Sequence, residues 1–314
     1  MNYIFYAHKG YMDYLELSIN QALELCKDAQ IILLGDEGNS KIPGVIHDNI
    51  NNYSEYAKKF GNVYVNYNSR NYNYYLFCFT RWFSIYEYMK KHNIEKAIHI
   101  DSDILVAYDI CKYLNEDEYM YSFDGGYTSC FTQDQLGKLC EFILNEYSNM
   151  DERQKLNEIY KKRMQANLRG GVSDMTLISM FATYNKCHDV TKIQDGYVFD
   201  HTIFKCDGFE MINDKKKVYC IDGKIYICDM ITNLYIKFIT AHFQGDGKVY
   251  MNAFLDYKKL GKGTYYFNYI DKSWDIDSGI IRNSFKDKMK IKFSELQCKF
   301  KKKAISIRAF NRKN

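Results

Sequence analysis

A strand that ends in two acids constrains the fold of this chain more than any other stretch. Residues 97–100 are apolar or nearly so, Asp101 and Asp103 follow, and a second apolar run, 104–106, comes after them. Residues i and i+2 of an extended segment project to the same side, so we expect both carboxylates to flank one small site. In open α/β sheets ligands bind beyond the carboxyl ends of the strands, where paired carboxylates and phosphate oxygens suit a hard divalent cation. The stretch predicts a metal-bound nucleotide diphosphate, although Asp-x-Asp alone is also common in solvated turns and helix N-caps.

Length and composition favour one compact domain. The chain has 314 residues, a single proline and no linker rich in Gly and Ser, so it can bury a sizeable core. Its first residues lack a charged segment before a long apolar core, and no apolar run approaches the roughly 18 residues of a spanning helix. We therefore expect a cytoplasmic protein that is neither exported nor inserted in a membrane. The ten cysteines include no C-x-x-C pair, so we interpret them as reduced and mostly buried and expect no structural zinc site.

Positive charge is concentrated at the C-terminal end. Residues 282–314 contain 12 Lys and Arg against 2 acids, a net of +10 in a chain of net +4, which leaves −6 for residues 1–281. Basic and apolar residues are interleaved over 286–310, a pattern that can lie on an anionic membrane surface. A peripheral contact with the inner face of the cell membrane and a solvated end are both open interpretations. The charge is confined to this tail, so nucleic acid is not an expected partner.

Hydrophobic periodicity predicts an α/β fold whose sheet opens with a βαβ unit of parallel strands. Residues 51–75 are polar and weakly patterned, and 195–240 indicate only short strands and turns. Ser173 is an expected N-cap. The expected elements are, in order, strand 3–7, helix 11–27, strand 31–34, helix 75–91, strand 97–100, strand 119–123, helix 130–147, helix 151–167 and helix 173–184.

A second group of residues with binding chemistry is His242-Phe243-Gln244-Gly245-Asp246-Gly247-Lys248. Imidazole is a common ligand of transition metals, glycine lets the backbone approach a phosphate, and lysine supplies a compact positive charge for a diphosphate. The stretch is no Walker A loop, because His242 stands where that motif has its first glycine and Val249 where it has Ser or Thr. Taken alone, it also fits a Gly-rich turn that holds a hydrogen-bonded histidine.

Together the two motifs resemble nucleotide-sugar glycosyltransferases of the GT-A fold. The βαβ opening, the strand ending in Asp-x-Asp and the late His-Phe-x-Gly-x-x-Lys are similar to the family-eight retaining enzymes, which include glycogenin and bacterial lipopolysaccharide galactosyltransferases. The likeness covers roughly residues 1–255, and Val249 departs from the proline that ends the family's signature. It implies a single Rossmann-like mixed sheet flanked by helices in a glycosyltransferase domain, residues 1–260, followed by a basic C-terminal extension, residues 261–314.

The resemblance also implies roles for individual residues. Asp101, Asp103 and His242 match the metal ligands, and their mixed oxygen and nitrogen donors favour Mn²⁺ over Mg²⁺. Lys248 matches the group that contacts the diphosphate. The other donor-binding positions are Gly245 in the same loop, Asp101 or Ser102 on the ribose side, Arg81 on the preceding helix, and Ala7, His8 and Lys9 where the family holds the uracil ring.

The implied reaction moves a hexose from a nucleotide-diphosphate sugar, a UDP-sugar in particular, to a glycan or lipid-linked saccharide acceptor, as in polysaccharide or lipopolysaccharide biosynthesis. The metal ion and Lys248 would neutralise charge on the departing nucleoside diphosphate. An inverting reaction needs a base, for which Asp174 and Asp124 are the candidates, and a retaining one needs none on the opposite face. Asp174 has an alternative role as an acid in a helix's first turn, and Arg81 as a member of a surface ion pair.

Two other functions are open from the sequence. A haloacid-dehalogenase-type phosphatase also carries its nucleophile in an Asp-x-Asp after an apolar strand, but it needs Thr or Val where this chain has Leu105. A non-catalytic protein that binds nucleic acid or a membrane through its basic tail is the second alternative.

Overall fold

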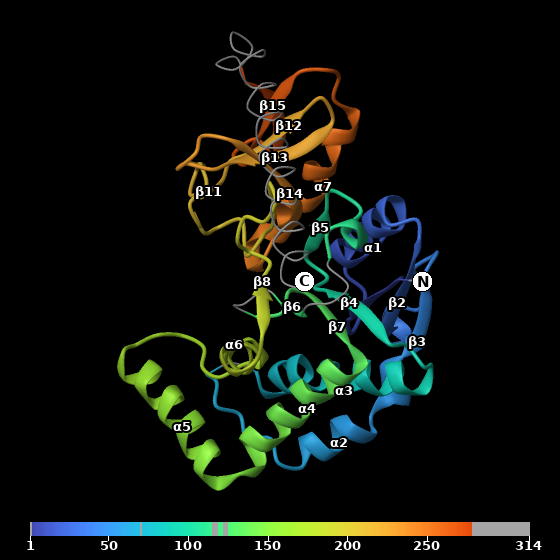
Figure 1. Ribbon diagram of the computed structural model, residues 1–314, viewed down its shortest axis with the longest axis vertical. Coiled ribbons are helices and arrows are strands. Elements are labelled where there is room, and N and C mark those ends of the chain that lie inside the picture. The colour runs from blue at the N-terminus through green and yellow to red at the C-terminus, as the bar shows by residue number, and fades with distance from the viewer. Residues whose placement is uncertain (1, 70, 115–118, 122–124, 278–314) are drawn as a thin grey trace, which may run out of the picture. The chain divides into compact units, whose positions relative to one another are not determined.

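The chain folds into two compact units of mixed α/β structure. The computed structural model describes residues 2–69, 71–114, 119–121 and 125–277 (Figure 1). Within them, the first unit comprises residues 2–19, 26–102 and 111–189, and the second unit comprises 20–25, 103–110 and 190–277. The chain passes between the units several times, and one of these passages separates Asp101 from Asp103.

The first unit contains a seven-stranded mixed sheet in the order β3-β2-β1-β4-β7-β6-β8. Its first four strands are parallel, β7 is antiparallel to β4 and β6, and β8 is parallel to β6. This confirms the α/β class and the parallel βαβ opening. The strands are β1 (Asn2–Ala7), β2 (Ala29–Gly35), β3 (Ile46–Asn49), β4 (Lys96–Ile100), β6 (Tyr119–Tyr121), β7 (Thr128–Thr132) and β8 (Cys187–Asp189), and the helices are α1 (Asp13–Leu25), whose end belongs to the second unit, α2 (Glu55–Gly61), α3 (Tyr72–Lys91), α4 (Gln133–Ser148), α5 (Met150–Gln165) and α6 (Asp174–Tyr184).

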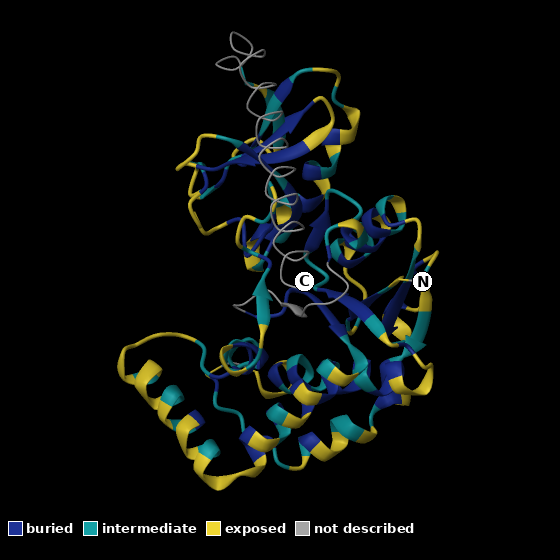
Figure 2. Cartoon of the chain, viewed as in Figure 1, coloured by how far each residue is buried: buried dark blue, intermediate teal, exposed yellow. Residues whose placement is uncertain are grey.

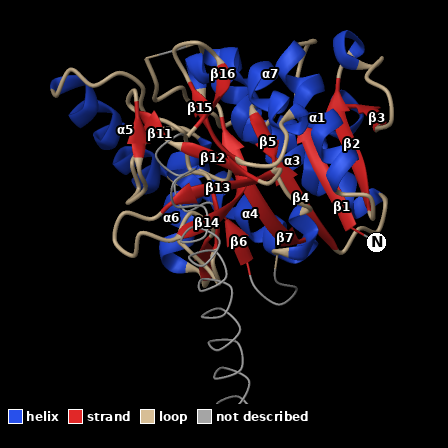
Figure 3. Ribbon diagram, turned by 90° about the horizontal axis from the view of Figure 1, so that it is seen from above, coloured by secondary structure: helices blue, strands red, loops and turns tan. Residues whose placement is uncertain are grey.

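Strand β1 is buried on both faces, which explains why its sequence reads as a nearly continuous apolar run. Phe5 and Ala7 belong to the core on the side of α3 and α4. Tyr6 faces the other way, and its hydroxyl lies 3.1 Å from the Ser18 hydroxyl of α1. Figure 3 shows the parallel strands of this sheet side by side with helices behind them, and α3 contacts β1 while α4 contacts β7.

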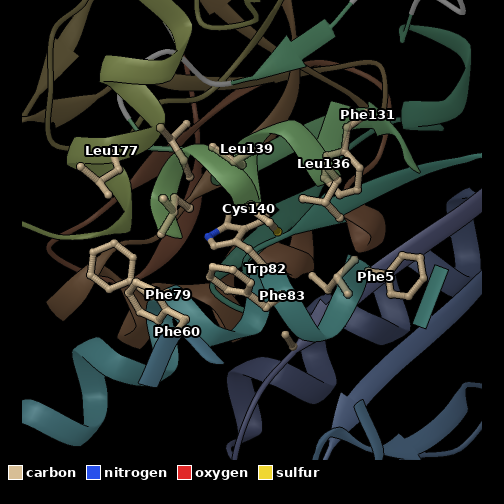
Figure 4. Close-up of a cluster of buried hydrophobic side chains, with 14 of the residues drawn as sticks. Phe5, Phe60, Phe79, Trp82, Phe83, Phe131, Leu136, Leu139, Cys140 and Leu177 are labelled. Atoms are coloured by element: carbon tan, nitrogen blue, oxygen red, sulfur yellow. The ribbon is translucent and has the colours of Figure 1, made fainter. Parts of the chain in front are cut away.

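The core between the sheet and the helices of the first unit is rich in aromatic rings. The Phe60 ring of α2 lies 5.4 Å from the Phe79 ring and 5.1 Å from the Phe83 ring, both on α3. Trp82 is fully buried in the same cluster (Figure 4). Helix α5, by contrast, is exposed along most of its length, with Leu156 as its buried residue (Figure 2). The packing of Trp82 fixes the direction of α3, which carries Arg81 as the preceding residue.

The second unit is built on a mostly antiparallel sheet in the order β16-β15-β12-β13-β14-β5, with β9 parallel to β14. Strand β5, which starts directly after Asp103, pairs with the end of β14 so that Ile104 faces His242. This pairing joins parts of both sequence motifs in one unit. The elements of this unit are β5 (Ile104–Val106), β9 (Tyr197–Phe199), β12 (Val218–Ile221), β13 (Lys224–Cys228), β14 (Tyr235–His242), β15 (Thr264–Asn268), β16 (Ser273–Ile276), the two-stranded ribbon β10 (Met211–Ile212) and β11 (Lys215–Lys216), and helix α7 (Met251–Phe254).

Short 3-10 helices occur in both units. They are η1 (Glu37–Asn39), η2 (Ile50–Tyr53), η3 (Ile110–Lys112), η4 (Gly245–Tyr250) and η5 (Leu255–Lys259).

Three expectations differ from the structure in detail. Residues 130–132 belong to β7 rather than to a helix, because α4 begins at Gln133 after the N-cap Thr132, whose side chain accepts a hydrogen bond from the Gln135 amide. Residues 51–75 contain α2, whose pattern is weak because Phe60 is its buried residue. The residues of the acidic pair form a turn, since β4 ends at Ile100, so the two acids do not project from one extended strand.

The sheet predicted from the sequence is the one in the first unit. The sheet of the second unit comes in addition, in a region where the sequence indicates only short strands and turns. Strands β15 and β16 belong to this sheet although they follow residue 260. The domain boundary placed there stays a prediction.

Two predicted features lie outside the described residues: the candidate base Asp124 and the basic tail from residue 282. The membrane contact of the tail therefore stays a prediction, which co-sedimentation with anionic vesicles can test. No helix in the described part of the chain is long and apolar enough to cross a membrane.

Candidate functional site

The turn after β4 places its two acids in different surroundings. The Asp101 amide donates to the Tyr127 carbonyl at 2.8 Å, which fixes the start of the turn in the first unit. The Asp103 carbonyl accepts the Phe243 amide at 2.9 Å, which fixes the end of the turn in the second unit. Each carboxylate has its own partners, Asp101 in the first unit and Asp103 in the second.

Arg81 of α3 is the centre of a buried charge cluster in the first unit. Its guanidinium donates to Asp101 Oδ1 at 2.6 Å and to Asp174 Oδ2 at 2.9 Å. Asp174, the first residue of α6, also accepts the indole N–H of Trp82 at 3.1 Å. Burial by itself lowers the pKa of Arg81, but the two carboxylates outweigh it and hold this pKa above its ordinary value. Three predicted site residues thus meet, and Arg81 is part of a buried cluster rather than of a surface ion pair.

His99 of β4 lies beneath this cluster as a neutral ring. Burial and the charge of Arg81 both lower its pKa well below the ordinary value. Its ring centre is 4.6 Å from that of Trp82, and its Nδ1 lies 3.4 Å from the Gly126 carbonyl oxygen. The histidine of the apolar strand is therefore a core residue that supports Trp82.

The loop after β1 meets the same turn within the first unit. His8 Nδ1 lies 3.1 Å from the Ser102 hydroxyl. Ala7 is the buried last residue of β1, and the Lys9 ammonium lies 5.2 Å from the centre of the Phe77 ring. The predicted uracil-binding residues are thus at the carboxyl end of a central parallel strand, where α/β sheets bind ligands.

Asp103, His242 and Lys248 form the second cluster, in the second unit. The Lys248 ammonium lies 2.5 Å from Asp103 Oδ2, and His242 Nε2 lies 3.4 Å from Asp103 Oδ1. His242 ends β14, and η4 returns the chain so that Lys248 reaches Asp103. Gly245 starts η4 with a φ of +58°, and a Cβ there would meet nothing within 4 Å. A glycine is needed for this backbone conformation rather than for space.

The hydrogen bonds of His242 indicate which ring nitrogen carries the proton. Its Nδ1 lies 2.5 Å from the His201 carbonyl oxygen, which can only accept, so Nδ1–H is the donor. A neutral His242 then presents the lone pair of Nε2 to the Asp103 carboxylate. Two acceptors that face each other repel, and a cation bound to both removes this repulsion.

The His242 Nε2 and Asp103 Oδ1 atoms are placed as two ligands of a divalent metal ion would be. Metal-binding histidines commonly donate their other N–H to a backbone carbonyl, as His242 does. Neighbouring ligands of an octahedral ion with bonds of about 2.1 Å lie about 3 Å apart, close to the separation of the His242 and Asp103 atoms. Burial raises the pKa of Asp103, but its cationic neighbours, His242 when that ring carries a second proton and the Lys248 ammonium, lower it below its ordinary value overall. The carboxylate is therefore ionised at neutral pH, as a ligand must be.

A buried ion network holds the His242 segment, and neither sequence motif predicts it. Asp200 Oδ2 accepts the His242 amide at 2.9 Å, and its Oδ1 accepts the Lys216 ammonium at 2.7 Å. Lys216 is 1% exposed and also donates to Asp207 Oδ2 at 2.7 Å and to the Thr202 carbonyl at 3.0 Å. The sequence did carry a signal, because Asp200 follows the apolar strand β9 as Asp101 follows β4.

Comparisons with known proteins give matches of structure only. No protein-family model and no curated protein matches the chain. Mouse xyloside xylosyltransferase 1 is similar with a TM-score of 0.39 and 9% identity, over 60% of this chain and 83% of that one. An active-site mutant of the galactosyltransferase LgtC is similar with a TM-score of 0.32 and 13% identity, over 50% of this chain and 70% of that one. A glycosyltransferase involved in the glycosylation of the major capsid of PBCV-1 is similar with a TM-score of 0.36 and 10% identity, over 80% of this chain and 100% of that one.

All three are glycosyltransferases, the class that the two motifs resemble. Because the TM-scores lie below 0.5, these matches add no argument about what this chain does.

The ion network generates a stability prediction. Lys216→Met should lower the free energy of unfolding by about 3–5 kcal/mol, because the buried Asp200 carboxylate loses its cation. The matched control is Lys155→Met in α5, whose partner Glu152 is near the surface, where we expect a loss within about 1 kcal/mol. Urea unfolding followed by circular dichroism measures both, and equal losses would contradict the assigned role of Lys216.

Proposed function

We propose that the chain is a metal-dependent glycosyltransferase that moves a hexose from a UDP-sugar to a glycan or lipid-linked saccharide acceptor. The observation that carries the proposal is the cluster of the second unit. There the Nε2 atom of an imidazole and an ionised carboxylate face each other beside a lysine, which suits a metal ion and a diphosphate. A role in polysaccharide biosynthesis follows from the acceptor class and is proposed with it.

Asp103 and His242 would hold the ion. One nitrogen and one oxygen donor favour Mn²⁺ over Mg²⁺, which prefers oxygen alone. Asp101, the other predicted ligand, accepts a hydrogen bond from Arg81 at 2.6 Å through Oδ1, and its role as a ligand stays a prediction. When bound, the ion supplies Lewis-acid stabilisation of the departing nucleoside diphosphate.

The chain's own groups perform the rest of the chemistry. Lys248 adds a positive charge for the diphosphate. Ser102 and His8, which touch each other, would orient the ribose and the base at the end of β1. Arg81 would hold Asp101 in place, because its guanidinium donates a hydrogen bond to that carboxylate at 2.6 Å.

We propose that the transfer retains the anomeric configuration. Of the two candidate bases, Asp174 is the one within the described residues. Its side chain is 4% exposed, and its Oδ2 accepts hydrogen bonds from both Arg81 and Trp82. These contacts favour a role in positioning Arg81 over the removal of a proton from an acceptor hydroxyl, and a retaining reaction needs no such base on the opposite face.

A haloacid-dehalogenase-type phosphatase is not favoured. Its reaction needs a free aspartate nucleophile, whereas Arg81 engages the carboxylate of Asp101. The decisive experiment is a screen of UDP-, GDP- and CMP-sugars with Mn²⁺, in which we expect UDP-sugar to bind and turn over. Hydrolysis of phosphate monoesters without any use of nucleotide sugar would overturn the proposal.

The metal proposal predicts the effect of removing either ligand. Asp103→Asn and His242→Ala should each weaken Mn²⁺ binding by at least about tenfold, because the first removes the negative charge of one ligand and the second removes a nitrogen donor. Both should also lower turnover of the UDP-sugar. Asp134→Asn in α4 is the matched control, since its carboxylate is mostly exposed. Titration of free Mn²⁺ by electron paramagnetic resonance measures the affinity, and unchanged binding in both site variants would refute the assignment.

A second prediction concerns Lys248, which competes with a metal ion for Asp103 Oδ2. Lys248→Met should strengthen Mn²⁺ binding in the absence of nucleotide, roughly fivefold for a pair worth about 1 kcal/mol. The same variant should weaken the binding of UDP in the presence of Mn²⁺, because a cation next to the diphosphate is lost. Calorimetry of both ligands tests the opposite signs, and parallel changes would contradict the dual role.

The stereochemical proposal predicts the first product formed. Proton NMR during the early reaction should show the anomeric configuration of the donor in the product. Asp174→Asn should keep that configuration while it lowers the rate, because Arg81 loses a charged partner. An inverted product would overturn the proposal and return Asp174 and Asp124 as candidate bases.

A further inference from the structure

Two cysteines that are distant in the sequence lie close together in the first unit. Cys26 directly follows α1, and Cys111 is the middle residue of η3. Their sulfur atoms lie within 4.8 Å of each other, and both side chains are reduced. A disulfide bond is about 2.05 Å long, so a change of side-chain rotamer has to close the remaining distance.

Cys111 also lines a cavity of about 250 Å³ in the same unit, together with Lys96 and Ile98 of β4 and Cys130 of β7. Cys130 precedes Phe131, which packs in the core beside α3 and α4, so Cys130 points to the opposite face of the sheet. The first residues of β1 and β4 belong to the lining. The cavity is therefore at the amino ends of these strands, whereas the residues proposed to bind the donor follow their carboxyl ends.

The two thiols differ in access, which assigns their roles. Cys111 is half-buried and lines the cavity, whereas Cys26 is 1% exposed, so a small reagent reaches Cys111 first. Lys96 is the charged residue of the lining, which favours an anionic reagent. Burial raises the pKa of the third thiol, Cys130, to about 11, although the charge of Lys96 acts against this change. Cys130 is therefore protonated at neutral pH and a poor nucleophile.

We propose that Cys26 and Cys111 are a modification site at which an anionic low-molecular-weight disulfide, such as oxidised glutathione, creates an intramolecular disulfide bond. The Cys111 thiolate attacks one sulfur of the small disulfide, a mixed disulfide forms, and one small thiolate leaves. The Cys26 thiolate then attacks the Cys111 sulfur, and the second small thiolate leaves. The small disulfide is reduced to two thiols, which take up the two protons that the cysteines lose. The site requires neither the metal cluster nor glycosyl transfer, so it lies beyond the proposed function.

Peptide mapping of the full chain tests the proposal. The reduced chain is incubated with oxidised glutathione, the remaining thiols are alkylated, and tryptic peptides are identified by mass spectrometry. Trypsin cleaves after Lys and Arg, so Cys26, Cys111 and Cys130 fall on the separate peptides 10–27, 97–112 and 113–138. We expect the first two peptides to become linked. A link from Cys111 to Cys130, or an end product in which Cys111 carries glutathione or the alkylating group, would overturn the proposal.

Variants and melting temperatures show whether the bond belongs to the native fold. Cys130→Ala should keep the link, whereas Cys111→Ala should leave Cys26 alkylated, because the reagent reaches Cys26 through Cys111. The oxidised chain should melt at least about 5 °C above the reduced chain, since the bond restricts residues 27–110 in the unfolded state. An equal or lower melting temperature would refute the assignment as a native pair. Asp103→Asn should leave the link unchanged, so the result does not depend on the metal experiments.

Discussion

The ion pairs of Arg81 with Asp101 and Asp174 are the interaction on which the first unit's site depends. A guanidinium that is 11% exposed cannot remain charged at low cost unless carboxylates surround it. The two acids come from the turn after β4 and from the start of α6, so one cation ties three segments together. Trp82, the next residue on α3, is packed in the aromatic core and also bonds Asp174. The orientation of the acidic turn is therefore a consequence of how α3 is buried.

The second unit also contains a buried cation, Lys216, that needs carboxylate partners. A buried ammonium is matched by Asp200 and Asp207, and Asp200 also accepts the backbone of His242. Burial acts against the charge of Lys216, but the two carboxylates raise its pKa overall, so the cation persists. A histidine whose amide and Nδ1 are both bound has little freedom to turn. Its Nε2 is thereby aimed at Asp103 before any ligand arrives, which is the preorganisation that a metal site needs.

The sequence predicted the elements that depend on local pattern and missed those that depend on distant partners. Strands β1, β2 and β4 and helix α3 could be predicted because a continuous apolar run or a helical period indicates burial directly. Helix α2 could not be predicted, since Phe60 is its one fully buried residue and the rings it packs against, Phe79 and Phe83, lie about twenty residues away. Both acids of the motif were found, but Arg81 and Asp174 are 93 positions apart, and no spacing rule relates them. The α/β class, which needs only the order of elements, was therefore predictable, whereas the separation of the two acids between units was not.

The contact between Lys248 and Asp103 has a consequence for the order in which ligands bind. In the chain without ligands the lysine is an internal counter-ion that satisfies the carboxylate. A divalent ion that binds Asp103 must displace this ammonium, and the displaced ammonium is then free for an anion. Metal and diphosphate are thus thermodynamically coupled through one side chain, and by reciprocity each raises the affinity for the other by the same factor. The apoprotein would discriminate against free nucleotide and free metal alike and favour the complex of the two.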